Sequence, residues 1–153
     1  MLVQARARLA RNITDRLIIL PTTDSAGLNR HIQRGTADVV TAIQCHHYLQ
    51  LEGRRQAVQA CFDLPVPGGL FVIFENVASS TPEGTRVGLK RRGTFQMTEG
   101  RPEHEADMHL SRYGTAFFPI PIEQHLELLT QTGFGVAELS GFSQMQAVFY
   151  GTN

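Results

Sequence analysis

The fold is decided by the stretch "ADVVTAIQCHHYLQLEGRRQAVQACFDLPVPGGLFVIFENV", residues 37–77. It begins with an apolar run at 37–43 and continues with a helical pattern at about 47–63. A Pro-Gly-Gly turn at 67–69 then leads into a second apolar run, "LFVIFENV". A strand, a helix and another strand at this spacing predict two parallel strands joined by a crossover helix. The chain is therefore expected to be an α/β protein.

The sequence on either side extends this pattern. Residues 1–12 have the apolar spacing of a helix, and "RLIIL" at 16–20 predicts a short buried strand that ends at Pro21. Near the other end, a helix is predicted over about 121–132, because proline residues precede it and Gly133 follows it.

The last segments complete the expected domain. Two alternating runs, 135–140 and 146–153, predict an antiparallel hairpin. Residues 78–118 have no sustained periodicity, which is typical of a functional cap. We expect one domain over 1–153, with a doubly wound, mostly parallel sheet, a C-terminal antiparallel hairpin and a capping insertion at about 78–118.

The composition argues against several classes of protein. Lys and Arg together number 14 and are balanced by 14 Asp and Glu, so general binding to nucleic acid or to anionic membranes is not expected. No apolar stretch is long enough to span a membrane. The 2 cysteines cannot form a disulfide framework. A cytoplasmic protein with free thiols is the expectation.

All three predicted strands lead into segments that carry hydrogen-bonding residues, namely "PTTDSAG", "QCHHY" and "ENVASS". Ligands of parallel sheets bind at the carboxyl ends of the strands, so these residues are expected to line one polar rim. Asp24 suits two roles there, accepting a hydrogen bond from a ligand amine or capping the turn that follows it. For Glu75 and Asn76, a role in forming a turn is slightly favoured.

The neighbouring His46 and His47 suit a general base, metal ligands or the start of a helix. Adjacent residues on a helix point about 100° apart, so the two imidazoles cannot easily bind one metal ion. A site that adds His104, Asp107 and His109 is a remote alternative. No metal is expected.

Two further side chains have a functional and a structural interpretation. Cys45 lacks any local signature of a nucleophile and is interpreted as a small apolar filler. Arg112, in the insertion, suits a clamp for a substrate carboxylate or phosphate, or is an ordinary solvated arginine.

Residues 37–77 resemble the middle of class I methyltransferases that use S-adenosylmethionine and act on small molecules. In those enzymes a strand of Asp-Val-Val type leads into a helix, and a Pro-Gly-Gly turn leads into the next strand. The closing stretch "LLTQTGFGVAELSGFSQMQAVFYGTN", 128–153, is similar to their last helix, Gly-Phe turn and hairpin. The resemblance implies a partial Rossmann-like fold, S-adenosylmethionine as cofactor and a small-molecule methyl acceptor.

The resemblance also implies a role for individual residues. Asp24 would contact the adenine amino group, and Ser25 would lie beside the adenine ring. His47, or alternatively His46, would face the acceptor as the catalytic base. The methionine part of the cofactor would lie against Thr41, Ala42, Ile43 and Gln44, and the acceptor would contact His109 and Arg112 in the cap.

One departure from the family pattern affects the expected activity. The glycine loop of the family, Gly-x-Gly-x-Gly after the first strand, is absent from the 153 residues, and so is the acidic residue that holds the ribose. "GFG" at 133–135 follows a helix and precedes a strand, which is the wrong context for such a loop. We expect the chain to match the C-terminal two-thirds of the fold, with impaired methyl transfer.

Whether the chain itself is an enzyme therefore stays open. The alternatives are a non-catalytic interaction module and a swapped homo-oligomer whose partner completes the sheet. A metal-dependent hydrolase that uses the histidines is a third hypothesis.

Overall fold

The computed structural model describes residues 18–143 and 145–153. In chain order the elements are η1 (Ser25–Arg30), β1 (Ala37–Ile43), η2 (His46–Tyr48), α2 (Leu51–Asp63), β2 (Pro65–Asn76), α3 (Pro82–Thr98), α4 (Glu103–Leu110), α5 (Ile122–Thr132), β3 (Val136–Ser143) and β4 (Gln146–Thr152). The two elements written η are short 3-10 helices.

The four strands form one sheet in the order β1-β2-β4-β3. β1 and β2 are parallel, with Ile43 opposite Phe74, and helix α2 is the crossover between them. The other two pairings, β2 with β4 and β3 with β4, are antiparallel. The α/β class and the C-terminal hairpin are thus confirmed, while the parallel part of the described sheet is a single pair.

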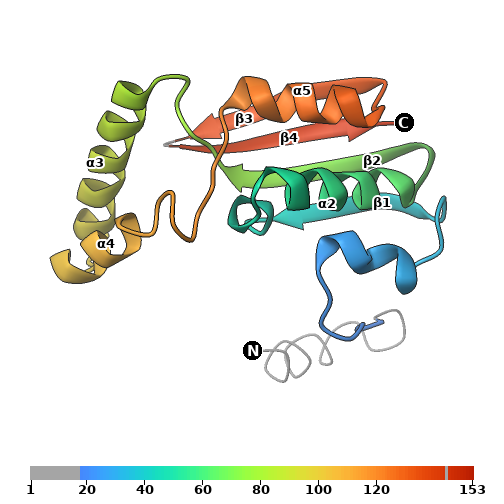
Figure 1. Ribbon diagram of the computed structural model, residues 1–153, viewed down its shortest axis with the longest axis horizontal. Coiled ribbons are helices and arrows are strands. Elements are labelled where there is room, and N and C mark those ends of the chain that lie inside the picture. The colour runs from blue at the N-terminus through green and yellow to red at the C-terminus, as the bar shows by residue number, and fades with distance from the viewer. Residues whose placement is uncertain (1–17, 144) are drawn as a thin grey trace.

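The main core lies between the sheet and two helices, α2 and α5, which pack on the same face of it (Figure 1). Phe71, Ile73 and Phe149 point into this core and are 0–1% exposed. On the opposite face, Val39 and Ile43 of β1 remain 55% and 62% exposed. The helices expected on both faces are therefore found on one face in the described part of the chain.

Two predictions concern the start of the chain. The helix at 1–12, and residues 16 and 17 of the first strand, lie outside the described residues. Over 18–20 the strand prediction is wrong, since these residues are irregular and Ile18 is 85% exposed. A strand needs a neighbour to pair its backbone groups, and no described strand lies beside this segment.

The predicted crossover helix is divided in two. His46–Tyr48 forms the separate turn η2, and α2 begins at Leu51, four residues later than predicted. β2 begins at Pro65, so the Pro-Gly-Gly sequence lies inside the strand, where Gly68 adopts a φ of 78°. The predicted helix near 121–132 is confirmed as α5, which ends at Gly133 with a φ of 116°.

The capping insertion folds into two helices, which its weak periodicity did not predict. Thr81 caps α3 by accepting from the backbone N–H of Gly84, and Pro82 occupies the first turn. Gly93 and Ala106 are the buried residues of α3 and α4, so neither helix needs a wide apolar face. The pair extends from one end of the sheet (Figure 1).

The two ends of this cap lie against each other. The backbone N–H of Ala78 donates to the carbonyl of Ile120 at 3.0 Å, and Ala78 forms a parallel bridge with Pro121. The cap is therefore a closed excursion from the carboxyl end of β2. Among the described helices, none has both the length and the apolar composition needed to cross a membrane.

Candidate functional site

The carboxyl ends of β1 and β2 lie side by side because the two strands are parallel and in register. β1 leads into Gln44, whose backbone N–H donates to the carbonyl of Phe74 at 2.7 Å. Gln44 has a φ of 53°, a left-handed conformation that costs a non-glycine residue on the order of 1 kcal/mol or more. This turn directs the next residues, Cys45 to His47, across the end of β2.

Glu75, near the end of β2, holds the turn η2 in place. Its two carboxylate oxygens accept from three consecutive backbone N–H groups, those of Cys45 at 3.0 Å, His46 at 2.8 Å and His47 at 2.7 Å. The side chain is fully buried. Burial by itself raises the pKa of a carboxyl, but the bonds from the His47 ring and from these N–H groups outweigh it and lower the pKa of Glu75.

His47 is oriented by the same carboxylate. Its Nδ1 lies 2.7 Å from Oε2 of Glu75, and the side chain is 2% exposed. Its ring packs against Tyr48 at 4.3 Å and against Phe117 of the cap at 5.6 Å between centroids. The site thus brings the predicted base next to the capping segment.

His46 points in a different direction. Its Nε2 lies 2.9 Å from the hydroxyl of Ser25, while its Nδ1 has no hydrogen-bond partner among the described atoms. Burial lowers the pKa of His46. Ser25 begins η1, and Asp24 caps that helix by accepting from the N–H of Gly27 at 2.7 Å. The capping interpretation of Asp24 is confirmed, and its exposed side chain leaves the ligand role a prediction.

Arg54 and His125 are two more buried polar side chains close to the histidine turn η2. Nη2 of Arg54 donates to the carbonyls of Phe118 at 2.6 Å and Leu49 at 3.3 Å. The N–H of Phe118 donates to the carbonyl of His47 at 2.7 Å, so the cap is tied to the histidine turn twice. His125, in α5, stacks on Phe149, and burial, together with the charge of Arg54, lowers its pKa to about 3.

The strand residues predicted to contact the cofactor divide between the two faces of the sheet. Thr41 and Ile43 are exposed on the uncovered face, whereas Ala42 is 5% exposed and belongs to the core under α2. Nε2 of Gln44 is buried without a hydrogen-bond partner in the described structure, an orphan donor that suits a polar ligand. The side chain of Ala42 is thus directed away from a ligand on the open face.

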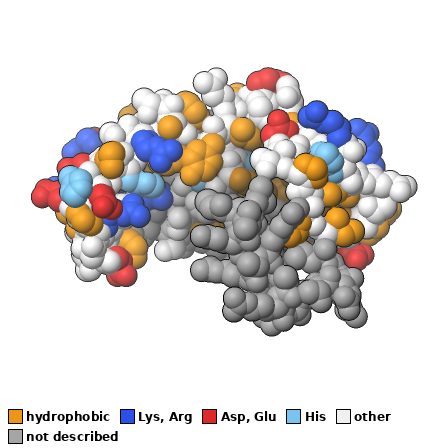
Figure 2. Space-filling view, turned by 90° about the horizontal axis from the view of Figure 1, so that it is seen from below, with side chains coloured by type: hydrophobic (Ala, Val, Ile, Leu, Met, Phe, Trp, Pro, Cys, Tyr) orange, Lys and Arg blue, Asp and Glu red, His pale blue; other side chains and the backbone are white. Residues whose placement is uncertain are grey.

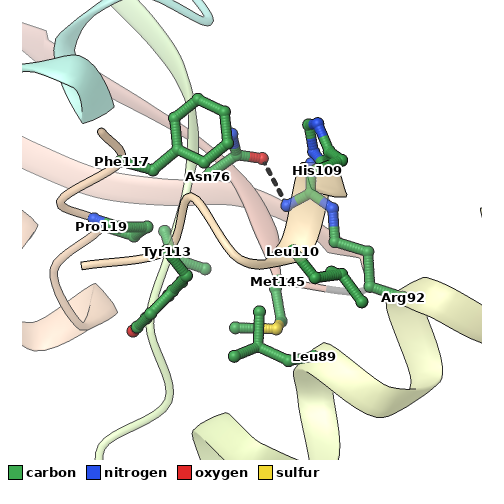
Figure 3. Close-up of a pocket in the computed structure, with 10 residues that line it drawn as sticks. Asn76, Leu89, Arg92, His109, Leu110, Tyr113, Phe117, Pro119 and Met145 are labelled. Atoms are coloured by element: carbon green, nitrogen blue, oxygen red, sulfur yellow. Dashed lines mark hydrogen bonds between the residues drawn. The ribbon is translucent and has the colours of Figure 1, made fainter. Parts of the chain in front are cut away.

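The two predicted acceptor residues, His109 and Arg112, both contact Phe117. The ring of His109 lies 5.3 Å from that of Phe117, and the guanidinium of Arg112 lies 4.4 Å from the centroid of the same ring. His109 lines a hollow at the end of β2, whereas Arg112 does not (Figure 3). Phe117 therefore connects the predicted base with the predicted acceptor residues.

The other chemical hypotheses find less support. In residues 18–143 and 145–153, no three His, Cys, Asp or Glu side chains are grouped to hold a metal ion, so the site imagined from His104, Asp107 and His109 is not assembled. Cys45 is exposed, so its interpretation as an apolar filler is wrong. Partial burial of its thiol and the charge of Glu75 raise the pKa of Cys45, which opposes a thiolate nucleophile.

Glu75 and Arg54 are the important residues that sequence reasoning missed. The sequence favours a turn former at Glu75, whereas its three backbone bonds reach residues 28 to 30 positions away along the chain. Arg54 has a local signal, because it precedes Ala57, Val58 and Cys61 at helical spacing and so belongs to the buried face of α2.

The comparisons with known proteins agree on one architecture. A solved structure of an O-methyltransferase family protein from Burkholderia thailandensis matches 97% of this chain with a TM-score of 0.65 and 18% identity. A second solved structure, PigF with SAH, matches 99% with a TM-score of 0.64 and 14% identity. The chain has part of the class I methyltransferase fold.

The sequence comparisons are sparser. No protein-family model matches the chain. A carboxy-S-adenosyl-L-methionine synthase from Trichodesmium erythraeum (strain IMS101) is 25% identical over 91 residues, which are 60% of this chain and 36% of that protein. The chain covers 40% of the protein chain in each of these two solved structures, so it spans about two-fifths of the proteins it resembles.

Proposed function

We propose that the chain takes part in S-adenosylmethionine-dependent methyl transfer to an oxygen, nitrogen or carbon atom of a small molecule, with His47 as the general base. The observation that carries the proposal is the pair of His47 and Glu75 at the joined ends of β1 and β2, packed against Phe117 of the cap. The class I methyltransferase fold supports it, as does the similarity to PigF, whose structure is of a complex with SAH.

The geometry gives each residue of the pair a task. The charged carboxylate of Glu75 favours the tautomer in which Nδ1 of His47 carries the proton, so Nε2 is left to accept a proton from the methyl acceptor. The same carboxylate stabilises the imidazolium that results. His46, which is bonded to Ser25 and fully buried, is assigned to support of the turn.

The bound cofactor supplies an electrophilic methyl group on a sulfonium. We propose that the orphan amide of Gln44 and the exposed side chains of Thr41 and Ile43 form part of the surface that binds it, with Asp24 and Ser25 at the adenine end. The main task of the protein is then to align the acceptor with the methyl group, since transfer is an in-line displacement.

The test combines cofactor binding with turnover. Formation of SAH is measured with a panel of small acceptors, for the chain and for His47→Ala, with exposed His31→Ala as the matched control. Loss of a general base should lower turnover about 10²-fold or more, without weakening binding of SAH in calorimetry. Unchanged turnover in His47→Ala would exclude the assigned base.

The same calorimetry tests the expectation of impaired cofactor binding. Micromolar affinity of the 153-residue chain for SAH would contradict that expectation. Absence of SAH formation with every acceptor, together with no measurable SAH binding, would contradict the proposed cofactor instead.

A second candidate, an interaction module or a homo-oligomer, is favoured by one observation. β1 pairs on one side only with β2 among the described strands, and Val39 and Ile43 beside that free edge are largely exposed. Such an edge is a template for pairing with another chain. Light scattering coupled to size exclusion distinguishes the two, because this candidate requires a discrete dimer that Ile43→Lys converts to monomer.

A further inference from the structure

A hollow between the cap and the carboxyl end of β2 has an unusual lining. Its polar side chains are Asn76 from β2, Arg92 from α3, and His109 and Tyr113 from the end of the cap. Figure 3 shows the guanidinium of Arg92 and the ring of His109 converging on this end of β2 from two different helices. Nη1 of Arg92 donates to the side-chain oxygen of Asn76 at 2.9 Å.

The cationic groups around this hollow repel one another. Burial, followed by the charges of Arg92, Arg101 and Arg112, lowers the pKa of His109. Burial, followed by the charge of Arg101, lowers the pKa of Arg92. Clustered positive charge of this kind is unfavourable unless a negative charge lies nearby.

No described carboxylate forms an ion pair with these arginines. The ion pairs found in 18–143 and 145–153 do not include Arg92, Arg101 or Arg112. The side-chain bonds of Arg92 and Arg101 are to neutral groups, the amide of Asn76 and that of Gln96. The guanidinium of Arg112 lies over the ring of Phe117.

The outer surface of the cap differs from the hollow. Blue, pale blue and red side chains alternate over this end of the molecule in Figure 2. The acidic side chains of α4, Glu103, Glu105 and Asp107, are exposed. Of the described residues that line the hollow, none is acidic. Inside the hollow the positive charge is that of Arg92, with His109 beside it, while Arg101 and Arg112 are exposed outside the lining.

The rest of the lining is apolar and sets the kind of molecule that fits. It consists of the side chains of Val77, Leu89, Leu110, Phe117, Pro119 and Met145. The empty space, including the open mouth, is about 310 Å³, and the part wide enough for water is about 20 Å³. A ligand therefore enters only with some movement of the cap side chains, and a compact one is favoured.

We propose that the methyl acceptor is a small aromatic or aliphatic carboxylate whose anionic group binds Arg92 and His109. Arginine presents several N–H donors in a plane, which matches the two oxygens of a carboxylate. The apolar lining receives the body of the acceptor, and Phe117 of that lining packs against His47. That the bound molecule is a methyl acceptor rests on the proposed function, whereas its carboxylate is inferred from the hollow alone.

The test compares two probes that differ in charge but scarcely in shape, benzoate and benzamide, by ligand-observed NMR with the full 153-residue chain. Benzoate should bind about tenfold more tightly or better, as a charge-assisted hydrogen bond requires. Arg92→Gln should remove that preference, and Arg92→Lys should retain part of it. Arg86→Gln, in the same helix but in an exposed ion pair with Glu83, is the matched control and should behave like the parent chain.

The proposal would be overturned if the two probes bound equally or if neither bound. It would also be overturned if Arg86→Gln lost the preference for benzoate as much as Arg92→Gln. Neither probe requires the cofactor. Selective binding of benzoate by a chain without methyl transfer would therefore refute the proposed function and leave the carboxylate site standing.

Discussion

The floor and the cap of the site differ in whether their charged groups are compensated by neighbouring groups. In the floor, formed by η2 and the end of β2, the buried carboxylate of Glu75 is bonded to His47 and to three backbone N–H groups. In the cap, the arginines near His109 have neutral partners among the described residues. Because the charged carboxylate of the floor is hydrogen-bonded to neighbouring groups of the floor, the floor keeps its geometry without a ligand. The arginines near His109 form no ion pair among the described residues, so the cap is suited to bind an anionic ligand.

The largest effect is expected from Glu75→Gln. The N–H₂ group of the glutamine would face backbone N–H groups that also donate, so a hydrogen bond would be lost. The substitution also removes the negative charge that His47 faces. Breaking a buried, hydrogen-bonded charge typically costs about 3 kcal/mol, so urea denaturation should show a loss of that size. Glu138→Gln, on the exposed side of β3, should change the free energy of unfolding by less than about 0.5 kcal/mol. Similar losses in both variants would contradict the floor as described.

The next effect concerns pH and His125. Its pKa is lowered from 6.5 to about 3 in the folded chain, first by burial and then by Arg54. The unfolded chain therefore binds more protons between these values, and the free energy of unfolding should fall as the pH decreases through this range. His125→Gln should flatten the decline between about pH 6.5 and the range where Glu75 titrates, leaving the parts due to His46 and His109.

The control for this measurement is His31→Gln, which replaces an exposed histidine. It should leave the slope of stability against pH unchanged. A flat profile in the parent chain would show that His125 is not buried in neutral form.

A smaller effect is expected where floor and cap meet. Phe117 is 7% exposed and packs on His47, Tyr48 and His109. Phe117→Leu should cost about 1 kcal/mol, because a similar apolar volume remains. Loss of the aromatic ring should also shift the imidazole signals of both His47 and His109 in NMR spectra. A shift in one histidine alone would separate the two halves of the site.

The smallest effect on stability is expected in the cap. Arg101 is exposed, so Arg101→Gln should alter the free energy of unfolding by less than about 0.5 kcal/mol. It should nevertheless raise the pKa of His109, because one of the repelling charges is removed. NMR titration checks this, with Lys90→Gln on the exposed side of α3 as a control that leaves the pKa of His109 where it was.

The parts of the fold that follow local rules were predictable from the sequence. β1 has the predicted bounds, and the left-handed Gly133 ends α5 as expected. The role of Glu75 was not predictable from its neighbours, because it depends on the parallel register that places Phe74 opposite Ile43. Helices α3 and α4 escaped prediction because they bury little and so need no apolar stripe.

The prediction for the site was partly local as well. The polar rim was expected from three strand ends, of which the described structure forms two, those of β1 and β2. Gln44 and His47 follow β1, and Ser25 bonds to His46 without following a strand. Whether they bind cofactor or acceptor stays a prediction. The direction of each histidine was beyond sequence reasoning, because it is decided by partners 21 and 28 residues away.

The contact between Ala78 and Ile120 has a consequence for how proteins of this fold can diversify. Because the two ends of the cap meet at 3.0 Å, the whole excursion between them behaves as an exchangeable cassette. A different insertion can therefore be joined at the same two points, next to β2 and α5. Replacement of the cassette would change the lining of the hollow, and the new segment would have to supply the contacts that Phe117 and Phe118 make with the histidine turn.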